Sequence, residues 1–240
     1  MAPPPLVLLP GMNCTEQLWQ EVVPALPEVQ VVHGELVEPD LDACVEDLLT
    51  RLPPRFALAG LSLGGIVAMA LTRRAPERVE RLALLDTNAK APTDSQRQGW
   101  SSLLHRLEAG ASAADVQRDL LPVLLHEGAS RSVREATVRM GDTLGEQLLA
   151  AQLRLQATRV DERPGLGRVT VPTLVLAGRE DALCPPSSHR EIARLVPGSR
   201  LVLLERTGHL SPLERGARVA GELRAWLGLD VDHDRVDTQG

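Results

Sequence analysis

Short apolar segments alternate with longer amphipathic segments along most of the chain. The short runs have the length and composition of buried β-strands, and most end at glycine, proline, histidine or aspartate. The expected strands are residues 6–9, 29–33, 56–59, 81–86, 172–178 and 200–204. The expected helices, where apolar residues recur at helical spacing, are residues 15–26 (up to Pro24), 41–52, 66–75, 187–196 and 214–227. This alternation predicts an α/β fold with a mostly parallel sheet of about six strands and helices on both faces.

One segment, residues 91–166, departs from this alternation. It has no strand-like run, and its charged, amphipathic pattern is typical of helices separated by glycines. The helices expected there are residues 100–107, 113–125 and 133–158. We therefore expect a helical cap at 91–166, inserted into an α/β core that is formed by 1–90 and 167–229. The polar residues 230–240 are expected to form a C-terminal tail.

A Gly-x-Ser-x-Gly motif, in which Gly60 and Gly64 flank Ser62, lies between an expected strand and an expected helix. In that setting the motif predicts a sharp turn that holds the serine in strained backbone geometry and exposes its hydroxyl. A Cβ at either glycine would collide with the neighbouring strand or helix. The motif therefore makes Ser62 the candidate nucleophile, although a small-residue packing turn is the alternative.

Two further side chains complete a candidate catalytic set. Asp181 and His209 each follow an expected strand, as Ser62 does, and the carboxyl ends of parallel strands meet at one edge of a sheet. A serine hydroxyl reacts readily only when a base removes its proton, and a histidine held by a carboxylate is the usual base. We therefore predict that His209 is the general base and that Asp181 orients it.

Other polar residues compete for these roles or lie near them. Asp86 also ends a strand and is the alternative acid, while His33 ends a strand without a glycine beside it. Cys14 and Cys184 lie near the expected site and are interpreted as inert packing residues. The remaining histidines are expected to be solvated side chains, namely His105, His126, His189 and His233. For His105 and His126, which lie in the expected cap, a place in the pocket wall is the alternative.

Composition narrows the classes of function. The 240 residues carry 26 basic and 32 acidic side chains, so the net charge of −6 offers no basic surface for nucleic acid or an anionic membrane. No apolar run is long enough to cross a bilayer. The three cysteines favour reduced thiols in the cytoplasm, and no Cys/His cluster has metal-ligand spacing. We expect no metal or organic cofactor, and the pattern leaves monomer and homodimer open.

The chain resembles α/β-hydrolase-fold enzymes from about Leu6 to Leu227. The resemblance rests on the segments Leu8-Leu9-Pro10-Gly11-Met12, Gly60-Leu61-Ser62-Leu63-Gly64-Gly65, Gly178-Arg179-Glu180-Asp181 and Gly208-His209-Leu210-Ser211-Pro212. It implies that the backbone N–H groups of Met12 and Leu63 form an oxyanion hole, and it favours Asp181 over Asp86. Pro10 stands where the family usually has histidine, and the family's extra N-terminal strands are missing.

The resemblance is closest to the esterase, enol-lactonase and C–C hydrolase branch of this fold. We expect a serine hydrolase that cleaves small-molecule carboxylic esters with small to medium acyl chains through an acyl-enzyme. An enol-lactonase or a diketone C–C hydrolase is the alternative on the same fold. A ligand receptor without catalysis is the third reading, and reaction with a fluorophosphonate would argue against it.

Overall fold

The computed structural model describes residues 3–229, and a six-stranded sheet runs through its centre in the order β2-β1-β3-β4-β5-β6. The strands are β1 (Leu6–Leu9), β2 (Val31–His33), β3 (Phe56–Leu61), β4 (Val79–Leu85), β5 (Thr173–Gly178) and β6 (Arg200–Leu204). Every neighbouring pair is parallel. The predicted fold class is therefore confirmed.

Alternate residues of the strands pack into two separate cores. On β1, Leu6 and Leu8 belong to one buried cluster, whereas Val7 and Leu9 belong to the other. All four side chains are fully buried. Because both faces of the sheet are covered, the central strands carry continuous apolar runs, such as Leu82–Leu85 on β4, rather than an alternation of apolar and polar residues.

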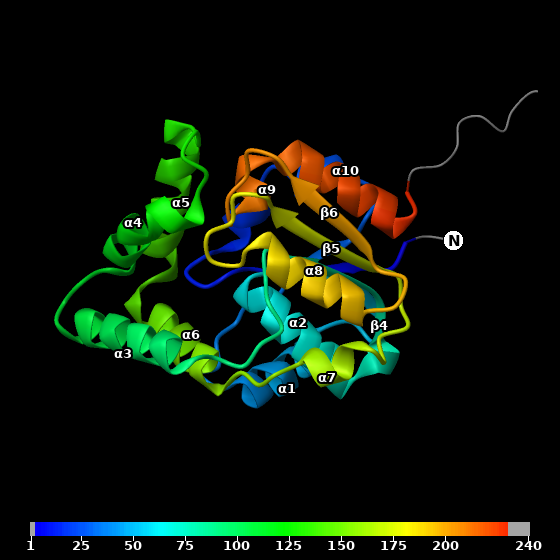
Figure 1. The fold of residues 1–240 in the computed structure, drawn as a ribbon, viewed down its shortest axis with the longest axis horizontal. Coiled ribbons are helices and arrows are strands. Elements are labelled where there is room, and N and C mark those ends of the chain that lie inside the picture. The colour runs from blue at the N-terminus through cyan, green and yellow to red at the C-terminus, as the bar shows by residue number, and fades with distance from the viewer. Residues whose placement is uncertain (1–2, 230–240) are drawn as a thin grey trace, which may run out of the picture.

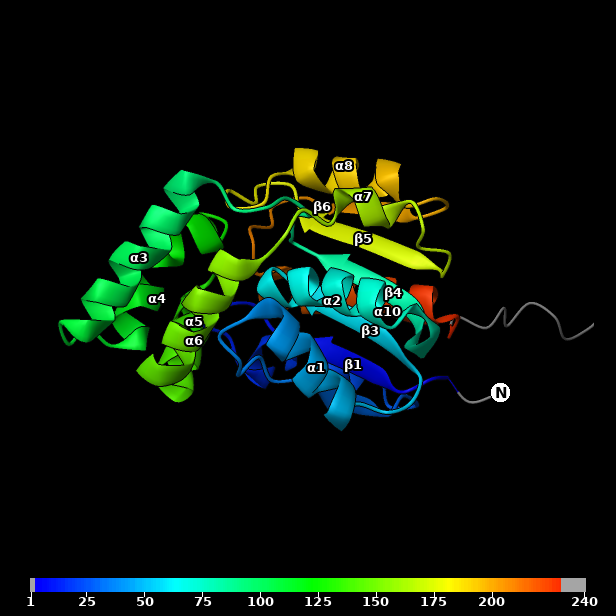
Figure 2. The same ribbon diagram turned by 90° about the horizontal axis from the view of Figure 1, so that it is seen from below.

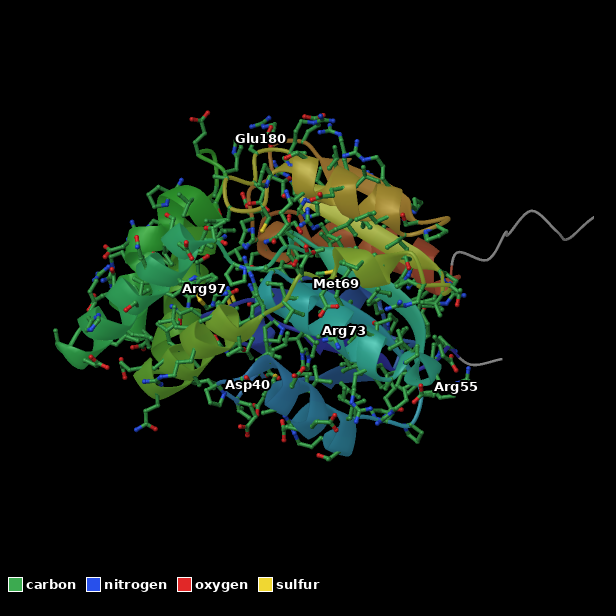
Figure 3. All side chains as sticks on the ribbon, turned by 60° about the horizontal axis from the view of Figure 1, so that its bottom comes forward. Asp40, Arg55, Met69, Arg73, Arg97 and Glu180 are labelled. Atoms are coloured by element: carbon green, nitrogen blue, oxygen red, sulfur yellow. The ribbon has the colours of Figure 1, made fainter. Side chains whose placement is uncertain are left out.

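Helices cover both faces of the sheet. The helices on one face are α1 (Leu41–Arg51), α2 (Leu63–Arg74), α7 (Arg163–Leu166) and α8 (Pro186–Leu195), and α10 (Gly216–Leu227) lies on the other (Figures 1 and 2). Two short elements, η3 (Pro76–Arg78) and α9 (Ser211–Glu214), lie in connections. Asp40, which is labelled in Figure 3, caps α1 through bonds from the backbone N–H groups of Asp42 (3.0 Å) and Ala43 (3.1 Å).

The segment between β4 and β5 contains four longer helices beyond the carboxyl end of the sheet (Figure 2). They are α3 (Asp94–Glu108), α4 (Ala113–Leu124), α5 (Arg131–Leu144) and α6 (Glu146–Thr158). Residues 133–158 do not form one helix, because Gly145 at φ 79° separates α5 from α6. We call residues 91–166 the helical insertion, and we propose that it caps a core formed by 1–90 and 167–229.

The helix expected within residues 15–26, up to Pro24, is wrong. This segment contains two short 3₁₀ turns, η1 (Glu16–Trp19) and η2 (Val23–Ala25). Pro24 has no N–H to donate and clashes with a preceding helical turn, so a continuous α-helix does not pass through it. The expected tail at 230–240 lies outside the described residues. Within residues 3–229, no helix has both the length and the apolar character needed to cross a membrane.

Candidate active site

Ser62 occupies a strained turn between β3 and α2. Its backbone adopts φ 54° and ψ −113°, a conformation that L-residues rarely adopt. A Cβ added to Gly60 would lie 2.2 Å from the carbonyl oxygen of Gly64, and one added to Gly64 would lie 2.4 Å from that of Leu9. The crowding predicted for the motif is therefore present. The absence of a Cβ at these two glycines allows the turn to pack closely against β1 and the start of α2.

The loops after β3, β5 and β6 leave the sheet at its carboxyl end, on the side of the helical insertion (Figure 2). These loops bring Ser62, Asp181 and His209 together. His209 Nε2 lies 2.8 Å from Ser62 Oγ, and His209 Nδ1 lies 2.8 Å from Asp181 Oδ2. His209 is 2% exposed and Asp181 is 3% exposed. The arrangement is an unbroken chain from carboxylate to imidazole to hydroxyl.

The loop after β5 holds the Asp181 carboxylate in one orientation. Its Oδ1 accepts hydrogen bonds from the backbone N–H groups of Leu183 (2.9 Å) and Cys184 (2.8 Å), which leaves Oδ2 to face the imidazole. Burial by itself would lower the pKa of His209, but the adjacent Asp181 carboxylate outweighs burial and raises that pKa. The imidazolium that forms when His209 takes a proton is therefore stabilised.

Asp86 lies next to this chain without entering it. Its Oδ1 accepts a bond from Gly178 N–H (2.8 Å), and its Oδ2 accepts one from the hydroxyl of Ser211. Burial, followed by the nearby Asp181 charge, raises the pKa of Asp86 well above its usual value. Asp86 thus ties the end of β5 to the residues that follow His209. The sequence indicated only a strand end here and not these partners.

The residue after Asp86 contributes a second support that sequence reasoning missed. Thr87 donates its hydroxyl to the carbonyl oxygen of Ser62 (2.7 Å), and its backbone N–H donates to Nε2 of His189 (2.8 Å). His189 is fully buried, so the expectation that it is solvated is wrong. Burial lowers the pKa of His189 to about 4, which keeps the ring neutral and able to accept this bond.

The loop that carries His209 is anchored to the helical insertion. The backbone N–H of His209 donates to the carbonyl oxygen of Leu124 at the end of α4 (2.9 Å). The Glu214 carboxylate accepts one bond from Gly208 N–H (2.9 Å) and another from His126 N–H (3.0 Å), so it bridges the same two segments. Burial raises the pKa of Glu214 to about 7. No motif in the sequence indicated this bridge.

Two backbone N–H groups were predicted to form an oxyanion hole. Leu63 is the first residue of α2, so its N–H has no acceptor within the helix. Met12 lies in the turn after β1 and lines the same cavity as Ser62. The carbonyl oxygen of Pro10 packs against Gly64, so the loop after β1 contacts the turn that carries Ser62 without the histidine usual in the family. The role of both amides stays a prediction.

Ser62, the candidate nucleophile, lines a cavity of about 390 Å³ between the sheet edge and the helical insertion. The walls are mostly apolar, with Leu and Ile side chains from the core and Leu side chains from the helical insertion. Cys14 and Cys184 also line this cavity, and burial raises the pKa of each thiol to about 12. Both thiols therefore stay protonated at neutral pH, in agreement with inert packing roles.

Three side chains at the site, Asp181, Cys184 and His209, are close enough together to be considered as metal ligands. A cysteine ligand must be a thiolate, and the raised pKa of Cys184 opposes that state. The facing atoms of Asp181 and His209 are already paired with each other. This donor set favours proton transfer over metal binding.

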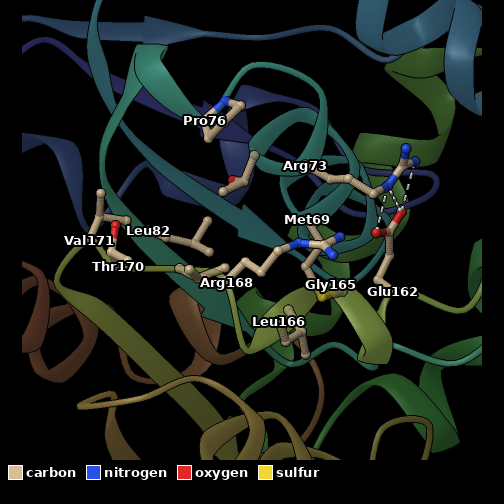
Figure 4. A pocket seen from close by; sticks show the side chains of 12 residues that line it. Met69, Arg73, Pro76, Leu82, Glu162, Gly165, Leu166, Arg168, Thr170 and Val171 are labelled. Atoms are coloured by element: carbon tan, nitrogen blue, oxygen red, sulfur yellow. Dashed lines mark hydrogen bonds and ion pairs between the residues drawn. The ribbon is translucent and has the colours of Figure 1, made fainter.

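A second cavity, of about 180 Å³, lies between α2 and α7 (Figure 4). Arg73 and Glu162 form an ion pair at its rim with Nε–Oε2 at 2.9 Å, and Met69 contributes to its apolar wall. Arg73 lies eleven positions after Ser62 along α2, which corresponds to roughly 16 Å of helix. This cavity is therefore separate from the reactive serine.

Comparison with known proteins finds relatives over most of the chain. A model of the alpha/beta hydrolase fold matches residues 36–216. The pimeloyl-[acyl-carrier protein] methyl ester esterase of Aeromonas hydrophila is 30% identical over 228 residues, covering 86% of this chain and 88% of that protein. A thermophilic esterase from Thermogutta terrifontis, solved with malate bound, is similar with a TM-score of 0.85 and 27% identity, covering 94% of this chain and 89% of that chain.

A further solved structure shares the fold. The enol-lactonase of Burkholderia xenovorans LB400 has a TM-score of 0.81 at 23% identity, covering 94% of this chain and 92% of that chain. The family model spans well over half of the chain, and the resemblance found in the sequence is confirmed. The chain therefore belongs to the alpha/beta hydrolase fold family, and it is a hydrolase that acts on ester bonds.

Proposed function

We propose that this protein is a carboxylesterase that cleaves small-molecule esters through a Ser62–His209–Asp181 triad and an acyl-enzyme intermediate. The observation that carries the proposal is the hydrogen-bonded chain from Asp181 through His209 to Ser62, with both links at 2.8 Å. Ser62, at the end of this series of hydrogen bonds, lines a cavity that lies between the sheet edge and the helical insertion. A buried carboxylate, an imidazole and a strained serine in this order form the machinery of acyl transfer.

In the first half of the reaction, Ser62 Oγ attacks the ester carbonyl carbon while His209 Nε2 takes the hydroxyl proton. The carbonyl oxygen gains the negative charge and accepts hydrogen bonds from the N–H groups of Met12 and Leu63. When the tetrahedral intermediate collapses, the C–O bond to the alcohol breaks. The leaving oxygen takes the proton from His209, and the acyl group stays on Ser62.

In the second half, water replaces the alcohol. His209 takes a proton from the water as its oxygen attacks the acyl carbon, and the same amides stabilise the second oxyanion. Collapse of this intermediate breaks the bond to Ser62 Oγ, which recovers its proton from His209. The products are one carboxylic acid and one alcohol, and the enzyme returns to its starting state.

The cavity supports substrates with small to medium acyl chains. Its volume of about 390 Å³ and mostly apolar walls fit a short aliphatic chain. Methyl ester esterases acting on pimeloyl-[acyl-carrier protein] are among the relatives, which supports cleavage of a small alkyl ester. All three cysteines are free thiols, which supports the proposal of a cytoplasmic location.

The proposal predicts that Ser62→Ala lowers kcat by roughly 10⁴-fold or more, because no other group can form the acyl-enzyme. The measurement uses p-nitrophenyl esters of increasing chain length, together with fluorophosphonate labelling followed by peptide mass spectrometry. Ser95→Ala, at an exposed serine on α3, is the matched control and should keep wild-type rates and labelling.

Lactones and β-diketones are measured beside the esters. Fast lactone or diketone cleavage with negligible turnover of every ester would replace the proposal with the corresponding alternative reaction. A wild-type protein that hydrolyses none of these compounds and takes no fluorophosphonate at Ser62 would instead be a receptor of this fold.

A further inference from the structure

Arg159 places an uncompensated positive charge in the wall of the reaction cavity. The side chain follows α6, is 5% exposed and lines the same cavity as Ser62. Among the cavity-lining residues within 3–229, it alone carries a permanent charge. Burying a charge without a counter-charge is unfavourable, so a buried guanidinium in this position indicates that a negatively charged group binds to it.

Neutral groups hold the guanidinium in place without balancing its charge. Nη1 donates to the side-chain oxygen of Gln156 (2.9 Å), and Nη2 donates to that of Gln96 (3.0 Å). The guanidinium carbon lies 5.1 Å from the centre of the Trp100 ring, in cation–π geometry. Within the described chain, no carboxylate forms an ion pair with Arg159, and its buried Nε has no hydrogen-bond partner.

The surroundings add further positive charge rather than negative charge. Arg97, labelled in Figure 3, lies on α3 and donates to the carbonyl oxygen of Ala157, close to Arg159 in the chain. Burial, together with the repulsion from Arg97, lowers the pKa of Arg159 below its usual value. An anion entering the cavity would relieve both of these costs.

We propose that Arg159 binds a carboxylate on the substrate, so that the preferred substrates are esters that carry a free carboxylate away from the scissile bond. The planar fork of a guanidinium matches the two oxygens of a carboxylate. One arginine balances one negative charge, whereas a phosphate monoester would leave excess negative charge in an apolar cavity. This inference rests on the proposed function, because it assigns a substrate class to the same site.

The test compares each carboxylate ester with a neutral analogue of the same shape. On the acyl side, monomethyl succinate, glutarate, adipate and pimelate are each compared with the methyl ester of the corresponding half-amide. On the alcohol side, acetate esters of hydroxy acids are compared with those of the hydroxy amides. Wild-type kcat/KM should favour the carboxylate member of at least one pair about tenfold or more, which matches one charged hydrogen-bonded pair.

Arg159→Met should bring this ratio close to one. Arg154→Met is the matched control, because Arg154 lies on the same helix with its side chain exposed, and its ratio should equal that of the wild type. Arg159→Lys keeps the charge but loses the planar fork, so its ratio should fall between the two. It also serves as the comparison if the methionine variant does not fold.

An arginine that only fastens α3 to α6 would give a different result. Arg159→Met would then lower kcat/KM for the carboxylate ester and for its neutral analogue in the same proportion. An unchanged ratio of these two kcat/KM values overturns the inference. A wild-type enzyme that shows no preference in either series overturns it as well.

Calorimetric titration of Ser62→Ala with the half-esters separates this inference from the proposed function. Binding that weakens about tenfold or more when Arg159→Met is added supports the carboxylate site even if no ester is hydrolysed. Efficient ester hydrolysis without carboxylate preference keeps the esterase and removes the carboxylate site.

Discussion

Asp86 and Asp181 are both buried aspartates at strand ends, but they face different partners. Asp181 points one oxygen at the imidazole and anchors the other on two backbone amides of its own loop. Asp86 uses both oxygens for Gly178 and Ser211. Asp181 therefore acts on the charge and tautomer of His209, whereas Asp86 acts on the position of the segments around it.

Asparagine at the two positions should separate these roles. In Asp181→Asn, the side-chain oxygen keeps the bonds from Leu183 and Cys184, so the amide NH₂ faces His209 Nδ1 and enforces the wrong tautomer. We expect kcat to fall by about 10⁴-fold. In Asp86→Asn, the oxygen still accepts from Gly178 and the Ser211 hydroxyl can rotate to accept, so kcat should fall less than about tenfold.

Steady-state kinetics with one p-nitrophenyl ester measures both variants, and thermal denaturation checks that both are folded. The pH profile adds a second readout. Asp181→Asn should also move the acidic limb of kcat/KM to lower pH, because the carboxylate that raises the pKa of His209 is gone. A larger loss in Asp86→Asn than in Asp181→Asn would transfer the acid role to Asp86.

The strand–turn–helix unit around Ser62 depends on close approach of three backbone segments. A Cβ at Gly64 would lie 2.4 Å from the carbonyl oxygen of Leu9 and 2.6 Å from that of Pro10. These are backbone atoms of a central strand and the turn that follows it, so they cannot move aside as a flexible side chain would. The same approach places the turn that carries Met12 beside Ser62.

Gly64→Ala should therefore lower the free energy of unfolding by about 2 kcal/mol or more, because the added methyl overpacks a rigid region. Gly221→Ala is the matched control. Gly221 lies within α10, and no atom lies near the added Cβ. This substitution should therefore raise the free energy of unfolding by about 0.5–1 kcal/mol. Urea denaturation measures both changes. Equal effects of the two substitutions would mean that the contact at Gly64 is not tight.

At the scale of the molecule, the six parallel strands and the three candidate triad residues could be predicted from local pattern, whereas the order of the strands in the sheet was not predicted. Apolar runs mark strands, and parallel topology gathers their carboxyl ends. The supports could not be predicted in this way. Thr87 with His189 and Arg159 with Trp100 are pairings between distant segments, and nothing in the neighbouring residues of either member indicates its partner.

The bridge made by Glu214 is another pairing between distant segments that the sequence does not indicate. It joins the core to the helical insertion. Its carboxyl group accepts bonds from Gly208 and His126, one on each side of the junction. Burial raises its pKa in the folded state from 4.5 to about 7. The folded protein therefore holds this proton more tightly than the unfolded chain does, and the coupling between the two parts depends on pH.

This shift gives the contribution of Glu214 to stability a definite sign. The contribution is complete below about pH 4.5, decreases as the pH rises towards 7, and is lost above that value. Glu214→Gln removes the titration, so its melting temperature should fall less between pH 5 and pH 8 than that of the wild type. Glu127→Gln, at an exposed glutamate, should follow the wild type. A Glu214→Gln variant with the wild-type slope would show that this carboxyl group titrates alike in the folded and unfolded chain, and that the bridge from core to insertion does not respond to pH.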